Sequence, residues 1–98
     1  MTRKYGSLIR TIFQYPISGN IHWRQLESLL HHLGATVEPL PGARYRVLLN
    51  NVEGILHHPH HSNVFSKQDI KHLRQYLAAA QVTPSLYEES QKNRAEPE

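Results

Sequence analysis

The chain has 98 residues, 39% of them hydrophobic, no cysteine and a formal net charge of +3. This length accommodates one domain, and without cysteine the chain has no disulfide framework and no thiolate nucleophile or metal ligand. No apolar run approaches the roughly 18 residues that a membrane span needs, and the first residues lack the apolar stretch of a signal peptide. We therefore expect a small soluble protein of the cytoplasm that makes no contact with a membrane.

Charge is distributed unevenly along the chain. Residues 1–86 contain nine Lys and Arg against four Asp and Glu, whereas the last twelve residues contain two against four. The first part of the chain is therefore basic and its C-terminal end is acidic. A small basic domain favours an anionic partner, and nucleic acid is the first candidate.

Two amphipathic helices are predicted in the first third of the chain. Residues 5–14 carry apolar side chains at helical spacing, and this helix must end before Pro16 because the residue preceding a proline is pushed out of the helical region. A second helix follows, with Asn20 as its N-cap and Gly34 at its C-terminal cap. Its apolar stripe, which we expect to pack in the core, comprises Trp23, Leu26, Leu29, Leu30 and Leu33.

The spacing of apolar residues changes from helical to alternating after Gly34. We expect a short strand over 35–38, ended by the Pro39–Gly42 stretch, and two further strands over 44–49 and 52–57. The pair Asn50-Asn51 suits the tight turn between the last two strands, because Asn tolerates a positive φ. The middle strand places Tyr45, Val47 and Leu49 on one face and Arg44, Arg46 and Leu48 on the other. Gly54 in the last strand indicates a bulge or the close approach of another backbone.

A third helix is predicted after residue 65. Ser66 and Asp69 have the spacing of a capping box. The buried side of this helix comprises Ile70, Leu73, Tyr76 and Leu77, and its outer side Lys67, Lys71, His72, Arg74 and Gln75. Thr83-Pro84 ends the helix. Residues 85–98 are charged and have no apolar periodicity, so we expect them to be disordered.

These elements predict an α+β fold. A three-stranded antiparallel sheet with the helices on one face forms a two-layer sandwich in the order α-α-β-β-β-α, which is the layout of double-stranded-RNA-binding domains. We expect a single domain over residues 1–84, with its core in 20–82 and the short helix 5–14 preceding it.

Several stretches of the chain together resemble one protein family over roughly residues 8–84. They are Ile21–Leu30, Leu33–Ala35, Gly42–Val47, Leu49–Val52, His57–His60 and Leu77–Val82. The resemblance is to the HicA toxins of bacterial type II toxin–antitoxin systems. It implies a double-stranded-RNA-binding-like fold, cleavage of mRNA without a metal or cofactor, and neutralisation by a HicB-type antitoxin.

The chain departs from the family pattern at one catalytic position. In HicA toxins the catalytic histidine follows a Gly-Ser pair at the start of the second strand, and the matching stretch here is Gly42-Ala43-Arg44. A second family motif, a Pro-His pair after the third strand, is present as Pro59-His60. The resemblance therefore supports the fold and the antitoxin partner more strongly than the nuclease chemistry.

The histidines around this second motif are the best candidates for that chemistry. Metal-free RNA cleavage needs a base for the ribose 2′-OH and an acid for the leaving oxygen, and imidazole titrates in the right range for both. The cluster comprises His57, His58, His60 and His61. We expect His60 to act as general base or acid, with His57 or His58 as its partner.

Basic side chains would hold the RNA phosphates. A simple hairpin register around Asn50-Asn51 places Arg44 and Arg46 opposite the residues around His57 and Ile55, where the guanidinium groups can clamp a phosphate. Lys67 and Lys71 extend this RNA-binding set onto the last helix.

Two other readings stay open. The first is a non-catalytic RNA-binding or antitoxin-binding module that kept the fold and lost the nuclease, for which Arg44 is the main argument. The second is a metal site, because His57/His60 and His58/His61 have H-x-x-H spacing, although no Cys and no nearby Asp or Glu completes a ligand set. We expect no physiological metal. The free sheet edge allows a homo-oligomer without indicating one.

Overall fold

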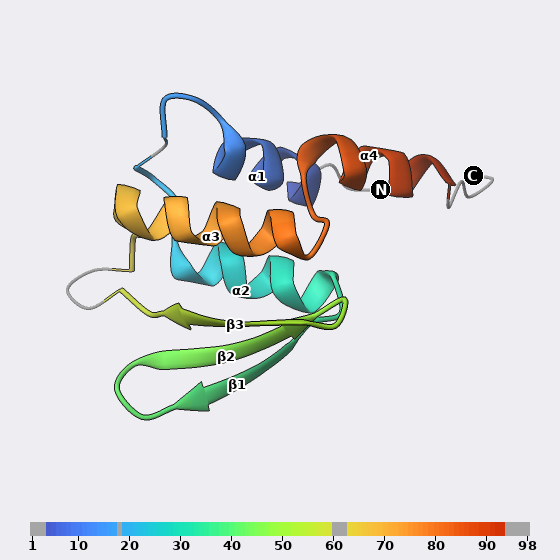
Figure 1. Ribbon diagram of the computed structural model, residues 1–98. Coiled ribbons are helices and arrows are strands. Elements are labelled where there is room, and N and C mark those ends of the chain that lie inside the picture. The colour runs from blue at the N-terminus through green and yellow to red at the C-terminus, as the bar shows by residue number, and fades with distance from the viewer. Residues whose placement is uncertain (1–3, 18, 60–62, 94–98) are drawn as a thin grey trace.

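The amphipathic segments of the chain form helices that pack on one side of a small sheet (Figure 1). The computed structural model describes residues 4–17, 19–59 and 63–93. In chain order, its elements are α1 (Lys4–Phe13), α2 (Trp23–His32), β1 (Thr36–Leu40), β2 (Arg44–Leu49), β3 (Val52–His57), α3 (Lys67–Ala79) and α4 (Pro84–Asn93). No helix in these ranges is both long and apolar enough to cross a membrane. The predicted α+β fold is confirmed.

The three strands form one antiparallel sheet in the order β1-β2-β3. Asn50 and Asn51 both have positive φ, at 53° and 68°, as a two-residue turn matched to the twist of the strands requires. This turn sets the predicted register, in which Arg44 lies opposite His57 and Arg46 lies opposite Ile55.

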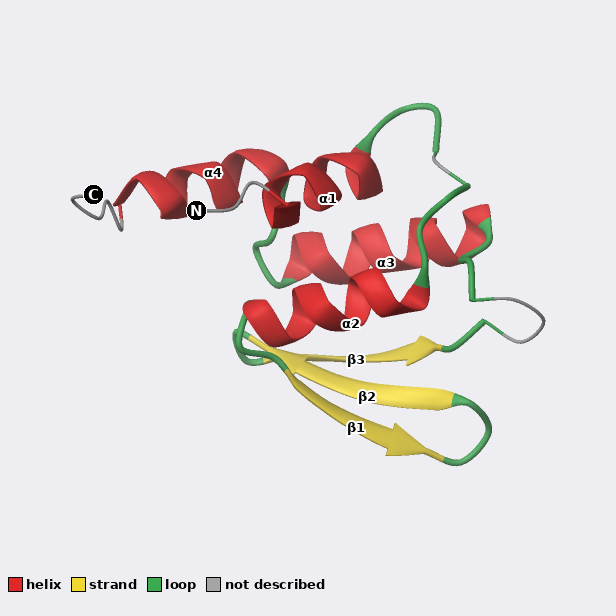
Figure 2. Ribbon diagram, turned by 180° about the vertical axis from the view of Figure 1, so that it is seen from behind, coloured by secondary structure: helices red, strands yellow, loops and turns green. Residues whose placement is uncertain are grey.

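Helices α2 and α3 cover one face of the sheet, and no described segment covers the other face (Figure 2). Helices α1 and α4 lie farther from the sheet, beyond α3, and contact each other. The core lies between the sheet and α2 and α3, and continues up to α1. Its most completely buried side chains are Ile9, Ile12, Ile21, Leu26, Leu29, Leu30, Val47, Ile70, Leu73 and Leu77. As predicted, Trp23 packs in this core, with its ring centroid 4.8 Å from that of Tyr45.

Gly54 is where α3 comes closest to β3. A Cβ at this position would lie 2.5 Å from Cδ1 of Tyr76, well inside van der Waals contact. The Tyr76 hydroxyl donates to the carbonyl oxygens of Val52, at 2.7 Å, and Val47, at 3.3 Å. The close approach predicted at Gly54 is therefore made by an aromatic ring and not by another backbone.

The ends of two elements differ from the prediction. Strand β1 continues through Pro39 to Leu40, because β1 lies at the sheet edge, where a missing N–H is tolerated. The N-cap of α2 is His22 and not Asn20, and the His22 N–H donates to the Gln25 side chain at 2.8 Å. The capping box predicted from Ser66 and Asp69 opens α3 as expected.

The prediction of disorder from residue 85 is wrong for residues 85–93. Pro84–Asn93 form α4, which packs against α1. The Tyr87 hydroxyl lies 2.9 Å from Nε2 of His32, whose ring stacks on Tyr5 with a centroid separation of 4.2 Å. Arg10 of α1 pairs with Glu88 of α4. Contacts between residues 55 and 78 positions apart in the sequence thus hold a helix whose own apolar pattern is weak.

Candidate catalytic cleft

Four segments that are distant in the sequence meet at one end of the molecule. They are the start of α2, the β1–β2 loop, the end of β3 and the start of α3 (Figures 1 and 2). Backbone bonds join them: the Phe65 N–H donates to the Ile21 carbonyl at 2.9 Å, and the His58 N–H donates to the Ala43 carbonyl at the same distance. This end collects most of the residues that the sequence singled out.

A cleft of about 120 Å³ lies at this end, between β3 and α3. Its apolar lining comprises Leu26, Leu56, Phe65 and Leu73, and its polar lining His57, Gln68, Asp69 and His72. Two histidines from different elements therefore border one cleft. The cleft thus places two imidazoles beside an apolar wall.

His57 is exposed and is the last residue of β3, an edge strand of the sheet. Its antiparallel partner is Arg44, the first residue of β2. Directly paired residues share a sheet face, and Arg44 lies on the same face as Arg46, so the guanidinium and the imidazole are neighbours on the face that α2 and α3 do not cover. This is the arrangement that the hairpin register predicted.

His72 is the residue that sequence analysis left out of the site. Helical periodicity assigned it to the outer side of α3, and it is indeed exposed. Gln68 and Tyr76, one turn before and one turn after it, lie on the side of α3 that faces β3. Only the packing of α3 against β3 brings His72 and His57 to one cleft. In the sequence, only the spacing of four residues between His72 and the buried Tyr76 indicated that His72 lies on the β3 side of α3.

His58 is placed differently from His57. It is half-buried, and its ring lies 5.0 Å from that of Trp23 and 6.4 Å from that of Tyr45, measured between centroids. Its Nδ1 lies 2.7 Å from the Pro59 carbonyl oxygen, which can only accept, so Nδ1 carries a hydrogen and donates. The contacts anchor the start of the loop after β3 and hold the His58 ring in place.

His60, the leading candidate base, and His61 lie outside the described residues. The same holds for both H-x-x-H pairs of the metal reading, each of which contains one of these residues. Within residues 4–17, 19–59 and 63–93, no three His, Asp or Glu side chains are grouped as metal ligands.

The four predicted phosphate ligands are not equivalent. The Arg46 guanidinium contacts two carboxylates, Glu38 at 3.2 Å and Glu53 at 3.0 Å, on the bare face of the sheet. Arg44 donates from Nε to the Pro41 carbonyl at 3.0 Å. Arg44, Lys67 and Lys71 form no ion pair with any described residue. Lys67 and Lys71 directly precede the cleft residues Gln68 and His72, and Arg44 pairs with His57 in the sheet. Arg46 is already neutralised by its two carboxylates.

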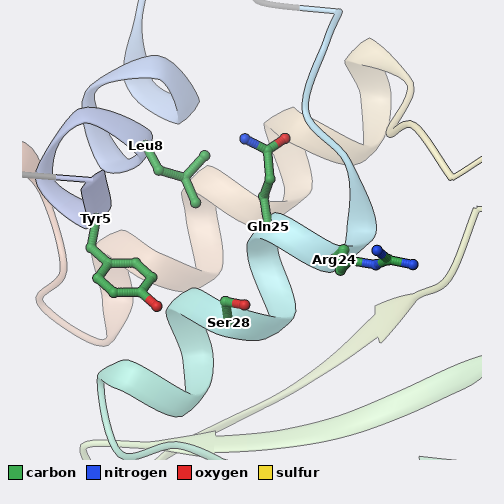
Figure 3. Close-up of a pocket in the computed structure, with 5 residues that line it drawn as sticks. All are labelled: Tyr5, Leu8, Arg24, Gln25 and Ser28. Carbon is green, nitrogen blue, oxygen red and sulfur yellow. The ribbon is translucent and has the colours of Figure 1, made fainter.

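A second groove, of about 220 Å³, lies between α1 and α2 (Figure 3). Tyr5 and Leu8 of α1 and Arg24, Gln25 and Ser28 of α2 line it. Among the described residues that line it, there is one cation, Arg24, and no histidine.

In comparisons with protein-family models, curated proteins and solved structures, none matched this chain.

Proposed function

We propose that the protein is a HicA-like toxin, a metal-independent endoribonuclease that cleaves mRNA in the cytoplasm and is neutralised by a HicB-type antitoxin. The observation that carries the proposal is the cleft lined by His57 and His72. Three cations without a described ion-pair partner adjoin its lining residues, Lys67 and Lys71 in the sequence and Arg44 by strand pairing. The order of α2, three strands and α3, which is that of double-stranded-RNA-binding domains, agrees with it. Helices α1 and α4 are additions to that core.

The reaction needs one base, one acid and positive charge at the phosphate. One imidazole takes the proton from the ribose 2′-OH while the 2′-oxygen forms a bond to phosphorus. The bond from phosphorus to the 5′-oxygen breaks, and a second, protonated imidazole gives its proton to that oxygen. In our proposal His57 and His72 fill these two roles, with His60, which follows His57 by three residues, as the alternative partner.

Arg44 and the two lysines have a separate role in this proposal. A pentacoordinate phosphorane carries more negative charge than the phosphodiester, so a nearby guanidinium stabilises the transition state more than the ground state. Arg44, directly paired with His57, is best placed for it. Lys67 and Lys71, at the start of α3, would bind flanking phosphates through charge alone.

The test is cleavage of RNA by purified protein in EDTA. We expect wild type to generate new 5′-hydroxyl ends. His57→Ala and His72→Ala should each lower the rate by about 10²- to 10⁴-fold, because each removes one proton transfer. His60→Ala decides whether that residue replaces either of them. His31→Ala is the matched control, since His31 is exposed in the last turn of α2, at the far end of the helix from the cleft.

Rates equal to wild type in both His57→Ala and His72→Ala, with unchanged melting temperatures, would refute the assignment of this cleft. A parallel growth assay, with transcripts mapped after induction, tests the toxin itself. Growth arrest with new transcript ends should disappear in the same variants.

A second function, binding of RNA or antitoxin without cleavage, is favoured by one observation. Arg44 stands where the resembling family has its catalytic histidine. The variant Arg44→His separates the two proposals. A gain of cleavage over an inactive wild type would indicate a lost nuclease, whereas loss of an existing activity would show that the arginine itself contributes.

A further inference from the structure

Tyr15 is the most exposed large hydrophobic residue that the structure describes, with 90% of its surface accessible. Tyr15 belongs to the segment that joins α1 to α2, and this segment lies at the same end of the molecule as the start of α3 (Figures 1 and 2). A single exposed aromatic ring is common on protein surfaces. Two further features, the anchoring of its backbone and the charge beside it, distinguish this one.

The backbone around Tyr15 is held in place by α3. Nε of Arg74 donates to the Ile12 carbonyl at 2.8 Å, and Nη2 of the same guanidinium donates to the Gln14 carbonyl. The Gln14 side chain donates in turn to the Pro16 carbonyl at 3.3 Å. Both neighbours of Tyr15 therefore take part in hydrogen bonds, while its own ring projects into solvent. A ring on an anchored backbone loses little conformational freedom on binding.

The segment runs along the first turns of α3. It starts beside Arg74, through the bonds just described, and ends at Ile21, whose carbonyl accepts from the Phe65 N–H just before α3. Lys71 and Lys67 lie three and seven residues before Arg74, on the continuation of the same helix side. Two lysines without a described ion-pair partner thus lie beside the segment that carries Tyr15.

The lysines also connect Tyr15 to the cleft. Lys67 and Lys71 directly precede Gln68 and His72, which line the cleft on the β3 side of α3. A polynucleotide crossing the exposed start of α3 would meet Tyr15, then the lysines, then the two histidines. The width of a helix with its side chains is about 10–12 Å, comparable to the span of two nucleotides.

We propose that Tyr15 is a stacking platform for an unpaired base of single-stranded RNA, a few nucleotides from the bond cleaved in the cleft. This inference rests on the proposed nuclease function and names its substrate as single-stranded. Aromatic rings bind unpaired bases by stacking, and lysines beside them bind the backbone. Paired bases have no free face for the ring. The basic surroundings favour RNA over an apolar protein partner for the same ring.

The experiment measures the affinity of a single-stranded RNA oligonucleotide, and of the matching duplex, for the full chain. Tyr15→Ala should weaken single-strand binding by about 5- to 150-fold, the range for loss of one stacked base. Tyr15→Phe should bind like wild type because it keeps the ring, and Tyr15→Leu should resemble Tyr15→Ala. Melting temperatures should be unchanged, since the side chain is almost fully exposed.

The outcomes separate this inference from the function on which it rests. A wild-type protein that neither binds nor cleaves RNA overturns both. If wild type cleaves RNA but Tyr15→Ala binds the single strand as tightly as wild type, the stacking platform is overturned and the nuclease function stands. The exposed ring would then be assigned to a protein partner. Equal weakening of duplex and single-strand binding in Tyr15→Ala also overturns the platform, because stacking requires an unpaired base.

Discussion

Replacing Gly54 with alanine tests the contact that fixes the distance between the two walls of the cleft. The added Cβ would lie 2.5, 2.7 and 3.3 Å from Cδ1, Cε1 and Cγ of Tyr76, whereas carbon atoms rest at about 3.5–4.0 Å. The ring cannot swing aside easily, because its hydroxyl donates to the Val52 carbonyl at 2.7 Å and the residue is 8% exposed. Either β3 or α3 must therefore move by about 1 Å.

The expected cost follows from two opposing effects. Overpacking of a well-packed site costs about 1–3 kcal/mol. A Gly→Ala change also stabilises by about 0.4–1 kcal/mol by restricting the unfolded chain. If the shift breaks the Tyr76 hydrogen bond, about 0.5–1.5 kcal/mol is added to the cost. We expect a net destabilisation of about 1–3 kcal/mol, and each kcal/mol lowers the melting temperature of a domain of this size by roughly 4–8 °C.

Thermal unfolding of Gly54→Ala and Gly19→Ala, side by side, measures this difference. Gly19 has no atom within 4 Å of its ideal Cβ position, so its variant should melt at or slightly above wild type. The double variant Gly54→Ala/Tyr76→Ala should lose less stability than the two single costs added, because the clash is gone. A melting temperature for Gly54→Ala at or above that of Gly19→Ala would refute the reasoning. We further expect slower RNA cleavage by Gly54→Ala, since β3 carries His57 and α3 carries His72.

Three further outcomes follow from individual side chains. Burial, with a smaller contribution from the charge of Glu53, raises the pKa of the Tyr76 hydroxyl above its usual 10.0, although a backbone hydrogen bond opposes the shift. The folded state then holds this proton more tightly than the unfolded state, so the contribution to the free energy of unfolding is complete below pH 10 and falls as the pH rises above it. Denaturation measured across this range should show a smaller loss of stability with pH for Tyr76→Phe than for wild type. Arg74→Ala should lower the free energy of unfolding by about 1.5–3 kcal/mol, because the carbonyls of Ile12 and Gln14 at the end of α1 lose their charged donor. An unchanged melting temperature would contradict these hydrogen bonds. Arg44→Ala should weaken RNA binding and lower the slope of log affinity against log salt by about 0.7, whereas Arg46→Ala should leave that slope unchanged because its guanidinium already pairs with two carboxylates.

Local patterns in the sequence were sufficient to predict most of the fold. The alternation in 44–49 and the Asn50-Asn51 turn predicted the β2–β3 hairpin and its register, because turn length sets pairing directly. Ser66 and Asp69 predicted the start of α3. The helix α4 was missed because its apolar residues are few and its order comes from Tyr87 and Glu88 meeting α1 and α2. Such contacts have no local sequence signal.

The candidate site divides in the same way. The pairing of His57 with Arg44 was predictable, because both lie in one hairpin. The approach of His72 was not, since it depends on how α3 packs against β3, and that packing depends on Gly54 accepting the Tyr76 ring. The ion pairs of Arg46 with Glu38 and Glu53 likewise required the order of all three strands. The proximity of residues joined by one turn could be predicted from the sequence, whereas the proximity of residues brought together by tertiary packing could not.

The nuclease proposal is tested most directly by the chemistry of the cleaved bond. The measurement is single-turnover cleavage in EDTA of an RNA strand and of the same strand with a 2′-deoxyribose at the mapped cleavage position. With two imidazoles acting on a ribose 2′-OH, the RNA is expected to yield a 2′,3′-cyclic phosphate and a 5′-hydroxyl, and the deoxy-substituted strand should stay intact. Cleavage of the substituted strand at the same bond, or products with 5′-phosphates, would contradict the roles proposed for His57 and His72.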